Sequence, residues 1–468
     1  MATSMTQSSV KIVGIIAFFL VFGIIGVITD MAIAETAPPD AAATAAISAG
    51  DSAWVLACSA LVLVMTPGLA FFYGGMVAAK NVLNTVLLSF ASIAVVGMVW
   101  MFAGYSLAFS PGTSVIGDLK WAGLVGVGEA ANPDYSATIP HILFMLFQSK
   151  FALITPALIV GAVVGRVRFR PWLVFVSLWS LLVYSPVAHW VWATTGWIRA
   201  SGSIDFAGGL VVHITAGVSA LVLALIFGRS KQFASGHELR PYNPVFVALG
   251  TGLLAFGWLG FNAGSALSAG GLASLAAANT FYASSAALAT WMLLEMAAKG
   301  RPTLVGSCIG TVVGLVGVTP AAGFVTVAAA FLIGGGTAMA AFFAIPLIKS
   351  VFKVDDTLDV FASHGVGGIV GAILTAVFAT KAVNPAGADG LLRGNTDLFI
   401  NQVIDTFAVV GYAAAVTAVL AIAIQRTIGF RVTESDEEQG LDATYQGEAV
   451  PELGLPHTGM SHTGNSAA

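Results

Sequence analysis

The chain has 468 residues, of which 57% are hydrophobic and only 9% are charged, and its formal net charge is −4. About a quarter of the residues of a soluble domain are charged, so this composition excludes an ordinary soluble protein, and the charge gives no indication of nucleic-acid binding. A mean hydropathy of +0.90 instead predicts an all-α protein that crosses a lipid bilayer many times.

The first segment of the chain has the pattern of a targeting sequence. Lys11 precedes an apolar run over residues 12–28, and Ala32-Ile33-Ala34 matches the small-residue cleavage pattern of a signal peptide. We expect residues 1–34 to be a cleaved signal peptide, with an uncleaved first helix as the alternative. Residues 35–50 would then form a short lead on the outer, periplasmic side.

Eleven apolar runs follow, each long enough as a helix to cross about 30 Å of hydrocarbon. The predicted spans are Ser52–Phe72, Leu83–Phe109, Ile142–Val164, Trp172–Trp192, Phe206–Phe227, Pro244–Leu267, Ala276–Ala298, Leu304–Val318, Val325–Ile348, Val360–Ala379 and Gln402–Ile428. We expect residues 51–428 to form one transmembrane domain, and the polar, acidic residues 429–468 to form a tail.

Lysine and arginine lie mostly on one side of these spans. Thirteen fall on one set of alternate connections and four on the other, and Lys11 and Lys150 complete the nineteen in the chain. By the positive-inside rule, the side with thirteen faces the cytoplasm. The mature amino terminus is therefore predicted to lie outside and the tail inside, which agrees with an odd number of spans.

Two histidines lie within predicted spans, where an ionisable side chain is costly and usually marks a substrate or ion pathway. His213 follows Asp205 by eight residues and His364 follows Asp359 by five, which places them about 12 Å and about 7.5 Å along their helices. The two helices enter from opposite sides, so both imidazoles approach the middle of the bilayer. One such histidine is usually a packing residue, but two in matching spans of two five-helix halves predict an inverted repeat with a site at the midplane.

Aromatic residues form a second pattern. Trp258, Phe261 and Ser265 share one face of the sixth predicted span, and Phe147 and Phe151 are an i, i+4 pair in the third. Each stripe alone fits ordinary packing. A role at a pore would need the ring faces to meet a cation and the hydroxyl group of Ser265 to form a hydrogen bond.

Six segments together closely resemble the ammonium transporter (Amt/Mep/Rh) family, in its bacterial Amt branch. They are Pro67–Gly75, Pro186–Trp192, Asp205–His213, Gly257–Ser265, Val316–Pro320 and Asp359–Gly368. The resemblance runs from about residue 51 to residue 442, with the motifs in the family's order and spacing.

The resemblance implies a role for each matching residue. Trp192 and Ser265 would recruit ammonium from outside, with Phe151 as another aromatic wall of the site. Phe151 and Phe261 would stack as a gate, and His213 and His364 would line a narrow hydrophobic pore below it. The supporting positions would be Asp205 as a structural and electrostatic partner, Tyr184 beside the gate, and Trp258, Thr280 and Phe147 near the pore.

The resemblance also implies an ammonium transporter, without enzymatic activity, metal or cofactor, that accepts methylammonium as an analogue. It would deprotonate NH4+ and pass NH3, with or without separate proton transfer, so electrogenic transport and a passive ammonia channel both stay open. We expect a homotrimer with one pore per subunit in the bacterial inner membrane, with a PII-type regulatory protein at its cytoplasmic face. The alternatives are an ammonium sensor acting through the tail and PII, and a redox or metal enzyme with the two histidines as ligands.

Three features bear on how far the resemblance extends. Lys150 stands where the family more often has a threonine or methionine, and would either snorkel outward or add positive charge near the outer vestibule. Gly161–Gly165 lacks the glutamate that often precedes Arg166, which puts a cytoplasmic ion pair in doubt. The acidic run 434–442 resembles the family's regulatory tail, which contacts the neighbouring subunit in relatives, and a solvated, disordered tail is the alternative.

Overall fold

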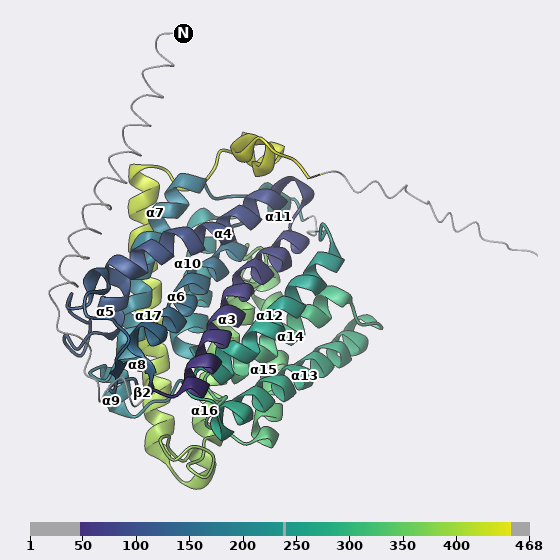
Figure 1. The fold of residues 1–468 in the computed structure, drawn as a ribbon. Helices are drawn as coiled ribbons and strands as arrows, with labels where there is room; N and C mark the ends of the chain where they lie inside the picture. The colour runs from purple at the N-terminus through teal and green to yellow at the C-terminus, as the bar shows by residue number, and fades with distance from the viewer. Residues whose placement is uncertain (1–46, 237–239, 451–468) are drawn as a thin grey trace, which may run out of the picture.

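The computed structural model describes residues 47–236 and 240–450, so the predicted signal peptide lies outside the described residues. The body is a bundle of long helices that lie side by side (Figure 1). Its long elements are α3 (Ala49–Met76), α4 (Val82–Val99), α6 (His141–Val163), α7 (Phe169–Trp179), α10 (Thr215–Phe227), α12 (Pro244–Gly264), α13 (Gly271–Lys299), α14 (Leu304–Val318), α15 (Val327–Pro346), α16 (Gly367–Phe378) and α17 (Thr396–Thr427).

Shorter elements extend or connect these helices. Of the six π-helical turns in the described residues, five extend helices of the bundle: η2 (Trp100–Gly104), η4 (Ser180–Tyr184), η5 (Gly209–Ile214), η6 (Leu347–Val351) and η7 (Phe361–Val366). The remaining elements are η1 (Ala79–Asn81), α5 (Tyr105–Phe109), η3 (Ala122–Leu124), β1 (Ala131–Asn132), β2 (Ser136–Pro140), α8 (Ser185–Trp192), α9 (Trp197–Ser201), α11 (Lys231–Ala234), η8 (Leu391–Arg393), α18 (Glu434–Gln439) and η9 (Asp442–Gln446). The two short strands β1 and β2 pair antiparallel.

Each of the eleven predicted spans corresponds to one long helix or to consecutive helical segments. Among the described residues, nine helical stretches are long and apolar enough to cross a membrane. The other two predicted spans are α13 and α14. α14 has only 15 residues, or about 22 Å, and α13 carries buried polar side chains such as Asn279 and Glu295. The fold is therefore an all-helical membrane protein with between nine and eleven spans.

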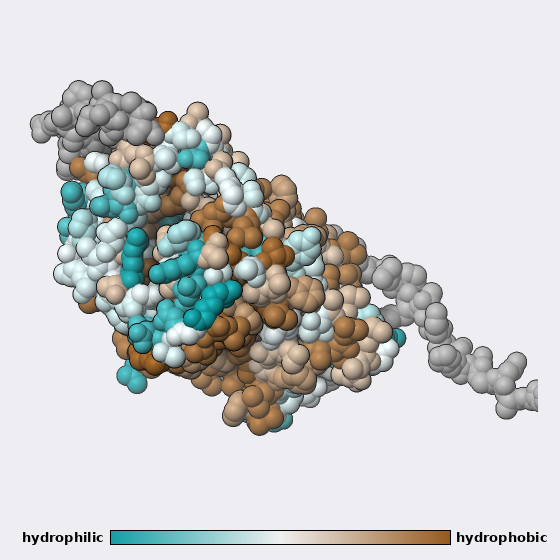
Figure 2. All heavy atoms as spheres, turned by 90° about the horizontal axis from the view of Figure 1, so that it is seen from below, coloured by the Kyte–Doolittle hydropathy of each residue, from teal (hydrophilic) through white to brown (hydrophobic). Residues whose placement is uncertain are grey.

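Large apolar side chains cover the flanks of the bundle. Leu225, Phe281 and Leu293 are each about 60% exposed, which water would disfavour and lipid tails accept. Figure 2 shows this apolar surface in brown, with polar side chains gathered on the face opposite the tail. The distribution fits a protein surrounded by lipid, with a polar end on this face.

The helices that carry the two histidines run in opposite directions. The residues after α10 lie at the start of η7, because the backbone N–H of Ser230 donates to the carboxylate of Asp355 at 2.8 Å. At the other end, Thr380 follows α16, and its N–H bonds the carbonyl of Phe324 at 2.9 Å. The Phe324 ring lies 5.5 Å from that of Phe206, just before η5. We call the end that holds Asp205 the Asp205 face and the other the tail face.

Glycine lets these two helices meet. A Cβ atom added to Gly217 would lie 2.1 Å from the backbone nitrogen of Gly365, closer than any side chain tolerates. Gly217 follows His213 by one helical turn, and Gly365 is the residue after His364. The close approach therefore brings the two imidazoles together at the crossing point.

Candidate functional site: a histidine pair behind an aromatic gate

The two histidines form a buried pair. The Nδ1 atoms of His213 and His364 are 3.2 Å apart, their ring centroids are 5.3 Å apart, and their residues are 1% and 4% exposed. If both rings are neutral, one Nδ1 donates and the other accepts, so one outward Nε2 carries a proton and the other does not. The pair then presents one hydrogen-bond donor and one acceptor. The Nε2 atom of His213 is buried and has no hydrogen-bond partner among the described residues, so it can meet a small polar molecule.

Two phenylalanines close the space on the Asp205 side of this pair. The rings of Phe151 and Phe261 lie 4.2 Å apart, tilted by 40°, and both residues are 1% exposed. Phe147 packs on Phe151 edge to face at 5.0 Å. The Phe261 ring lies 6.1 Å from His213, so the gate pair borders directly on the imidazoles.

Trp192 and Ser265 lie next to the gate and remain partly exposed. The Trp192 ring meets Phe151 edge to face at 6.0 Å, and its Nε1–H donates to the carbonyl of Asp205 at 3.0 Å. The Ser265 hydroxyl donates to the carbonyl of Phe261 at 2.8 Å, which leaves its oxygen lone pairs available to accept. Each of the two predicted recruitment residues is thus tied to one of the two gate residues.

Asp205 begins the helix of His213. Its carboxylate accepts hydrogen bonds from the N–H groups of Gly208, Gly209 and Leu210 at 2.7–2.8 Å and of Val211 at 3.3 Å. These are the unpaired donors of a helix start. The carboxylate is therefore occupied by backbone N–H groups at the start of η5.

The corresponding residue in the helix of His364 is Asp356, which sequence reasoning missed. Its carboxylate accepts from the N–H groups of Val360 at 3.1 Å and Phe361 at 2.7 Å. Asp356 precedes His364 by eight residues, as Asp205 precedes His213, and this repeated spacing could have identified it. Asp359, from which the depth of His364 is counted in the sequence, is the residue directly before this helix, and its carboxylate pairs with Lys349 at 2.7 Å.

The supporting residues lie at different distances from the pore. The Trp258 ring stacks on His213 at 5.4 Å, and its Nε1–H donates to Thr319 at 2.9 Å. The hydroxyl oxygen of Thr280 accepts from the amide of Asn262, the residue after Phe261 in α12, at 3.0 Å. The ring of Tyr184 lies 6.0 Å from that of Trp100.

Three cavities lie in line from the gate to the tail face. The first, of about 10 Å³, is lined by Met65, Leu69, Phe72, Ile154, Leu158, Val212, His213, Leu254, Trp258, Phe261, Val312 and His364. The second, also about 10 Å³, shares Phe72, Val312 and His364 and adds Tyr73, Ile309, Leu358, Val360 and Ser363. A third space of about 780 Å³ shares Ile309 and Leu358 and opens among charged side chains. Each small cavity has room for about one water-sized molecule, so the route behind the gate is narrow and largely apolar.

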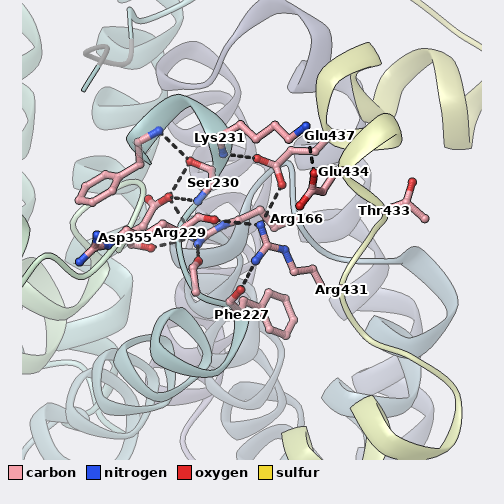
Figure 3. A network of polar contacts seen from close by, with 12 residues as sticks. Arg166, Phe227, Arg229, Ser230, Lys231, Asp355, Arg431, Thr433, Glu434 and Glu437 are labelled. Atoms are coloured by element: carbon pink, nitrogen blue, oxygen red, sulfur yellow. Dashed lines mark hydrogen bonds and ion pairs between the residues drawn. The ribbon is translucent and has the colours of Figure 1, made fainter. Parts of the chain in front are cut away.

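A polar network on the tail face joins the start of η7 to the tail (Figure 3). Arg166 is fully buried and lies 3.5 Å from the carboxylate of Asp355. The expected glutamate is missing before Arg166, but Asp355 supplies an ion pair from a distant part of the chain. Asp355 also accepts from the Ser230 hydroxyl at 2.6 Å, so the end of α10 and the start of η7 are held together.

The tail packs on this network. Glu437 accepts from the Lys231 N–H at 2.7 Å and from Arg431 at 3.0 Å, and Phe430 is fully buried. The carboxylate of Asp442 accepts from the N–H groups of Leu83 and Asn84 at the start of α4. The described part of the tail is therefore docked on its own chain and is not disordered, while the side chains of Glu434 and Glu438 stay exposed to solvent.

Comparison with known proteins agrees with this geometry. The model of the Ammonium Transporter Family matches residues 53–450. An ammonium transporter of Bacillus subtilis is 48% identical over 399 residues, which cover 85% of this chain and 98% of that protein. One from Aquifex aeolicus is 46% identical over 414 residues, covering 88% and 96%. The crystal structure of Saccharomyces cerevisiae Mep2 superposes with a TM-score of 0.78 at 36% identity, covering 83% of this chain and 88% of that one.

Proposed function

The chain belongs to the ammonium transporter family and is an ammonium transporter and not an enzyme, and on that premise we propose a route for its substrate. Ammonium is recruited at Trp192 and Ser265, gives up its proton at the gate of Phe151 and Phe261, and crosses as ammonia past His213 and His364. The observation that carries this proposal is the buried pair of imidazoles, joined through Nδ1. The pair lies directly behind the rings of Phe151 and Phe261, which are almost completely buried.

Recruitment uses groups that favour a cation carrying N–H donors. The faces of Trp192 and Phe151 attract a cation through their ring quadrupoles, and the oxygen of Ser265 can accept one N–H bond. Potassium has the charge of ammonium and no hydrogen to donate, so it gains only the first of these interactions. The site therefore favours ammonium over potassium.

Loss of the proton is favoured by what lies behind the gate. A small apolar cavity penalises an ion far more than a neutral molecule, so ammonia enters where ammonium is excluded. The histidine pair then offers the donor and the acceptor that ammonia needs to hydrogen-bond in transit. The proton either returns to the Asp205 face or passes separately along the imidazoles, and only the second case moves charge.

The Asp205 face is proposed to be external and the tail face cytoplasmic, because thirteen of the lysines and arginines lie on connections at the tail face. From the bacterial relatives and the leader-like pattern of the first segment, we also propose that the chain lies in the bacterial inner membrane and that residues 1–34 are a cleaved leader. From the family resemblance we further propose two inverted five-helix repeats, a homotrimer with one pore per subunit, and a PII-type partner at the tail face.

The test is a solid-supported-membrane recording on proteoliposomes given an ammonium jump, with radiolabelled methylammonium uptake in parallel. We expect saturable ammonium transport that potassium does not evoke. His213→Ala and His364→Ala should abolish or strongly alter it in protein that still elutes as wild type, whereas Cys308→Ala, at a buried position that does not itself line the pore cavities, should not. Unchanged transport in both histidine variants would overturn the route.

A single variant tests recruitment. Ser265→Ala should raise the KM for methylammonium more than it lowers the maximal rate, because it removes an interaction made before the gate.

A current that accompanies uptake would show that the proton crosses the membrane, and uptake without current would show a passive ammonia channel.

A further inference from the structure

The segment that leads into Asp205 is held by buried polar side chains of α17 that have no part in the proposed route. The side-chain amide of Gln402 bonds both backbone groups of Ile204: its Oε1 accepts from the N–H at 2.9 Å and its Nε2 donates to the carbonyl at 3.0 Å. Gln402 is fully buried. The amide thus replaces the pairing that a neighbouring strand would give this residue.

Asp405, one helical turn further along α17, binds two serine hydroxyl groups of the same segment. One carboxylate oxygen accepts from Ser201 at 2.5 Å and from Ser203 at 2.6 Å, and Asp405 is only 3% exposed. Hydrogen bonds to a buried carboxylate are stronger than those between neutral groups. Two adjacent residues of the segment, Ser203 and Ile204, are therefore fixed to α17.

The held segment continues directly into the recruitment site. Asp205 follows Ile204, its carbonyl accepts the Nε1–H of Trp192, and its carboxylate begins η5. On the far side, the N–H of Phe206 bonds the carbonyl of Pro320 at 3.1 Å. The carbonyl that orients Trp192 thus lies between two anchors, and the one on the Ile204 side is supplied by α17.

We propose that Gln402 and Asp405 are positioning residues of the ammonium recruitment site: they fix Ile204 and Ser203, and through Asp205 they set the orientation of Trp192. Neither side chain touches the substrate. The proposal rests on the proposed function, in which Trp192 binds ammonium. Removing the Gln402 amide releases the Asp205 carbonyl from one side, so the Trp192 ring loses its fixed orientation while the gate and histidine pair stay in place.

The test compares variants of the full chain in proteoliposomes by methylammonium uptake over a range of concentrations. Gln402→Met keeps the length of the side chain and removes both hydrogen bonds. We expect its KM to rise about fivefold, the effect of roughly one hydrogen bond of binding energy, with a maximal rate within about twofold of wild type. Thr406→Val is the matched control, because Thr406 is buried on the same helix with a hydroxyl group that has no partner among the described residues, and its KM should not change.

A double variant separates positioning from general disturbance. In a Trp192→Leu background, Gln402→Met should raise the KM no further, because there is no indole left to orient. An unchanged KM in Gln402→Met, a fall in maximal rate alone, or a full additional rise in the double variant would each overturn the inference.

Ser203→Ala provides a milder test that does not depend on Gln402→Met folding. It removes one hydroxyl bond to Asp405 and should raise the KM about twofold. If Trp192→Leu itself leaves the KM unchanged, the proposed recruitment role fails. If Trp192→Leu raises the KM and neither Gln402→Met nor Ser203→Ala does, only the positioning inference fails.

Discussion

The two helices that carry His213 and His364 begin in the same way, with a buried aspartate eight residues before the histidine, but the surroundings of the two aspartates differ. Asp205 has only neutral hydrogen-bond donors as partners, and none of the ion pairs in the described residues includes it. Asp356 lies beside two ion pairs, Arg166 with Asp355 and Lys349 with Asp359.

The two helix starts therefore use the same hydrogen-bonding pattern, an aspartate that accepts from backbone N–H groups, in two different electrostatic surroundings. On the proposed route, the Asp205 carboxylate, which has no basic partner among the described residues, would add to the attraction for a cation near Trp192. At the tail face Arg166 and Lys349 pair with Asp355 and Asp359, the two carboxylates nearest to Asp356 in the sequence. The two helix starts are alike in fixing an imidazole, and the different charges fit the proposed route, in which the substrate arrives as a cation and leaves the pore as a neutral molecule.

The largest effect is expected at Asp205. Asp205→Ala leaves up to four N–H groups of η5 unpaired at a buried helix start, each costing about 1–3 kcal/mol, so methylammonium uptake should fall about 100-fold or more. Asp205→Asn sharpens the comparison, because it keeps an acceptor oxygen and removes the charge. Full uptake by the asparagine variant would show that the negative charge contributes nothing to recruitment.

The second largest effect is expected when Arg166 is replaced. Arg166→Met leaves the buried carboxylate of Asp355 without its counter-charge, and breaking such a pair costs about 3–5 kcal/mol. The thermal unfolding midpoint in detergent should fall, while the KM of the protein that remains folded stays at the wild-type value. The double variant Arg166→Met/Asp355→Asn should recover part of the loss, and no recovery would contradict the ion-pair explanation.

Asp356→Ala should have a smaller effect than Asp205→Ala, since only two N–H groups lose their acceptor. We expect uptake to fall by about tenfold, equivalent to about 1.4 kcal/mol, with an unfolding midpoint between those of Asp205→Ala and wild type. If the two alanine variants lose uptake equally, the starts of η5 and η7 are energetically equivalent and the contrast drawn above fails.

The smallest expected effect is a change in how the stability of the protein depends on pH. Burial and the nearby charge of Asp359 raise the pKa of Asp356 from 3.8 to about 6. Between these values the folded protein keeps a proton that the unfolded chain releases, so the contribution of Asp356 to stability falls as pH rises from about 4 to about 6 and is constant above. The unfolding midpoint of wild type should therefore decrease over this range relative to Asp356→Asn, which cannot titrate. Parallel curves would exclude this ionisation.

The sequence predicted the parts of the molecule that depend on apolar patterning and motif spacing. The positions of the eleven helices follow from hydropathy, and the convergence of His213 and His364 from their matching places in oppositely directed spans. Residues 356 and 359 are both aspartates, and only the backbone path shows that the first caps η7 while the second turns toward Lys349.

The remaining features depend on contacts between distant segments. Arg166 meets Asp355, 189 residues away along the chain, and Gln402 meets Ile204, 198 residues away. No local pattern encodes either contact, because a buried glutamine in a helix has the same sequence signature whichever backbone it bonds. The π-helical turns that hold both histidines are equally invisible in the hydropathy pattern, since they need only one extra residue in a turn.

The tail contact at Asp442 has a consequence for the order in which the protein is made. The carboxylate that completes the first turn of α4 comes from residue 442, whereas α4 itself leaves the ribosome about 350 residues earlier. During that interval the N–H groups of Leu83 and Asn84 must bond water or lipid headgroups. The second span of the bundle is thus among the first to be synthesised and among the last to be finished.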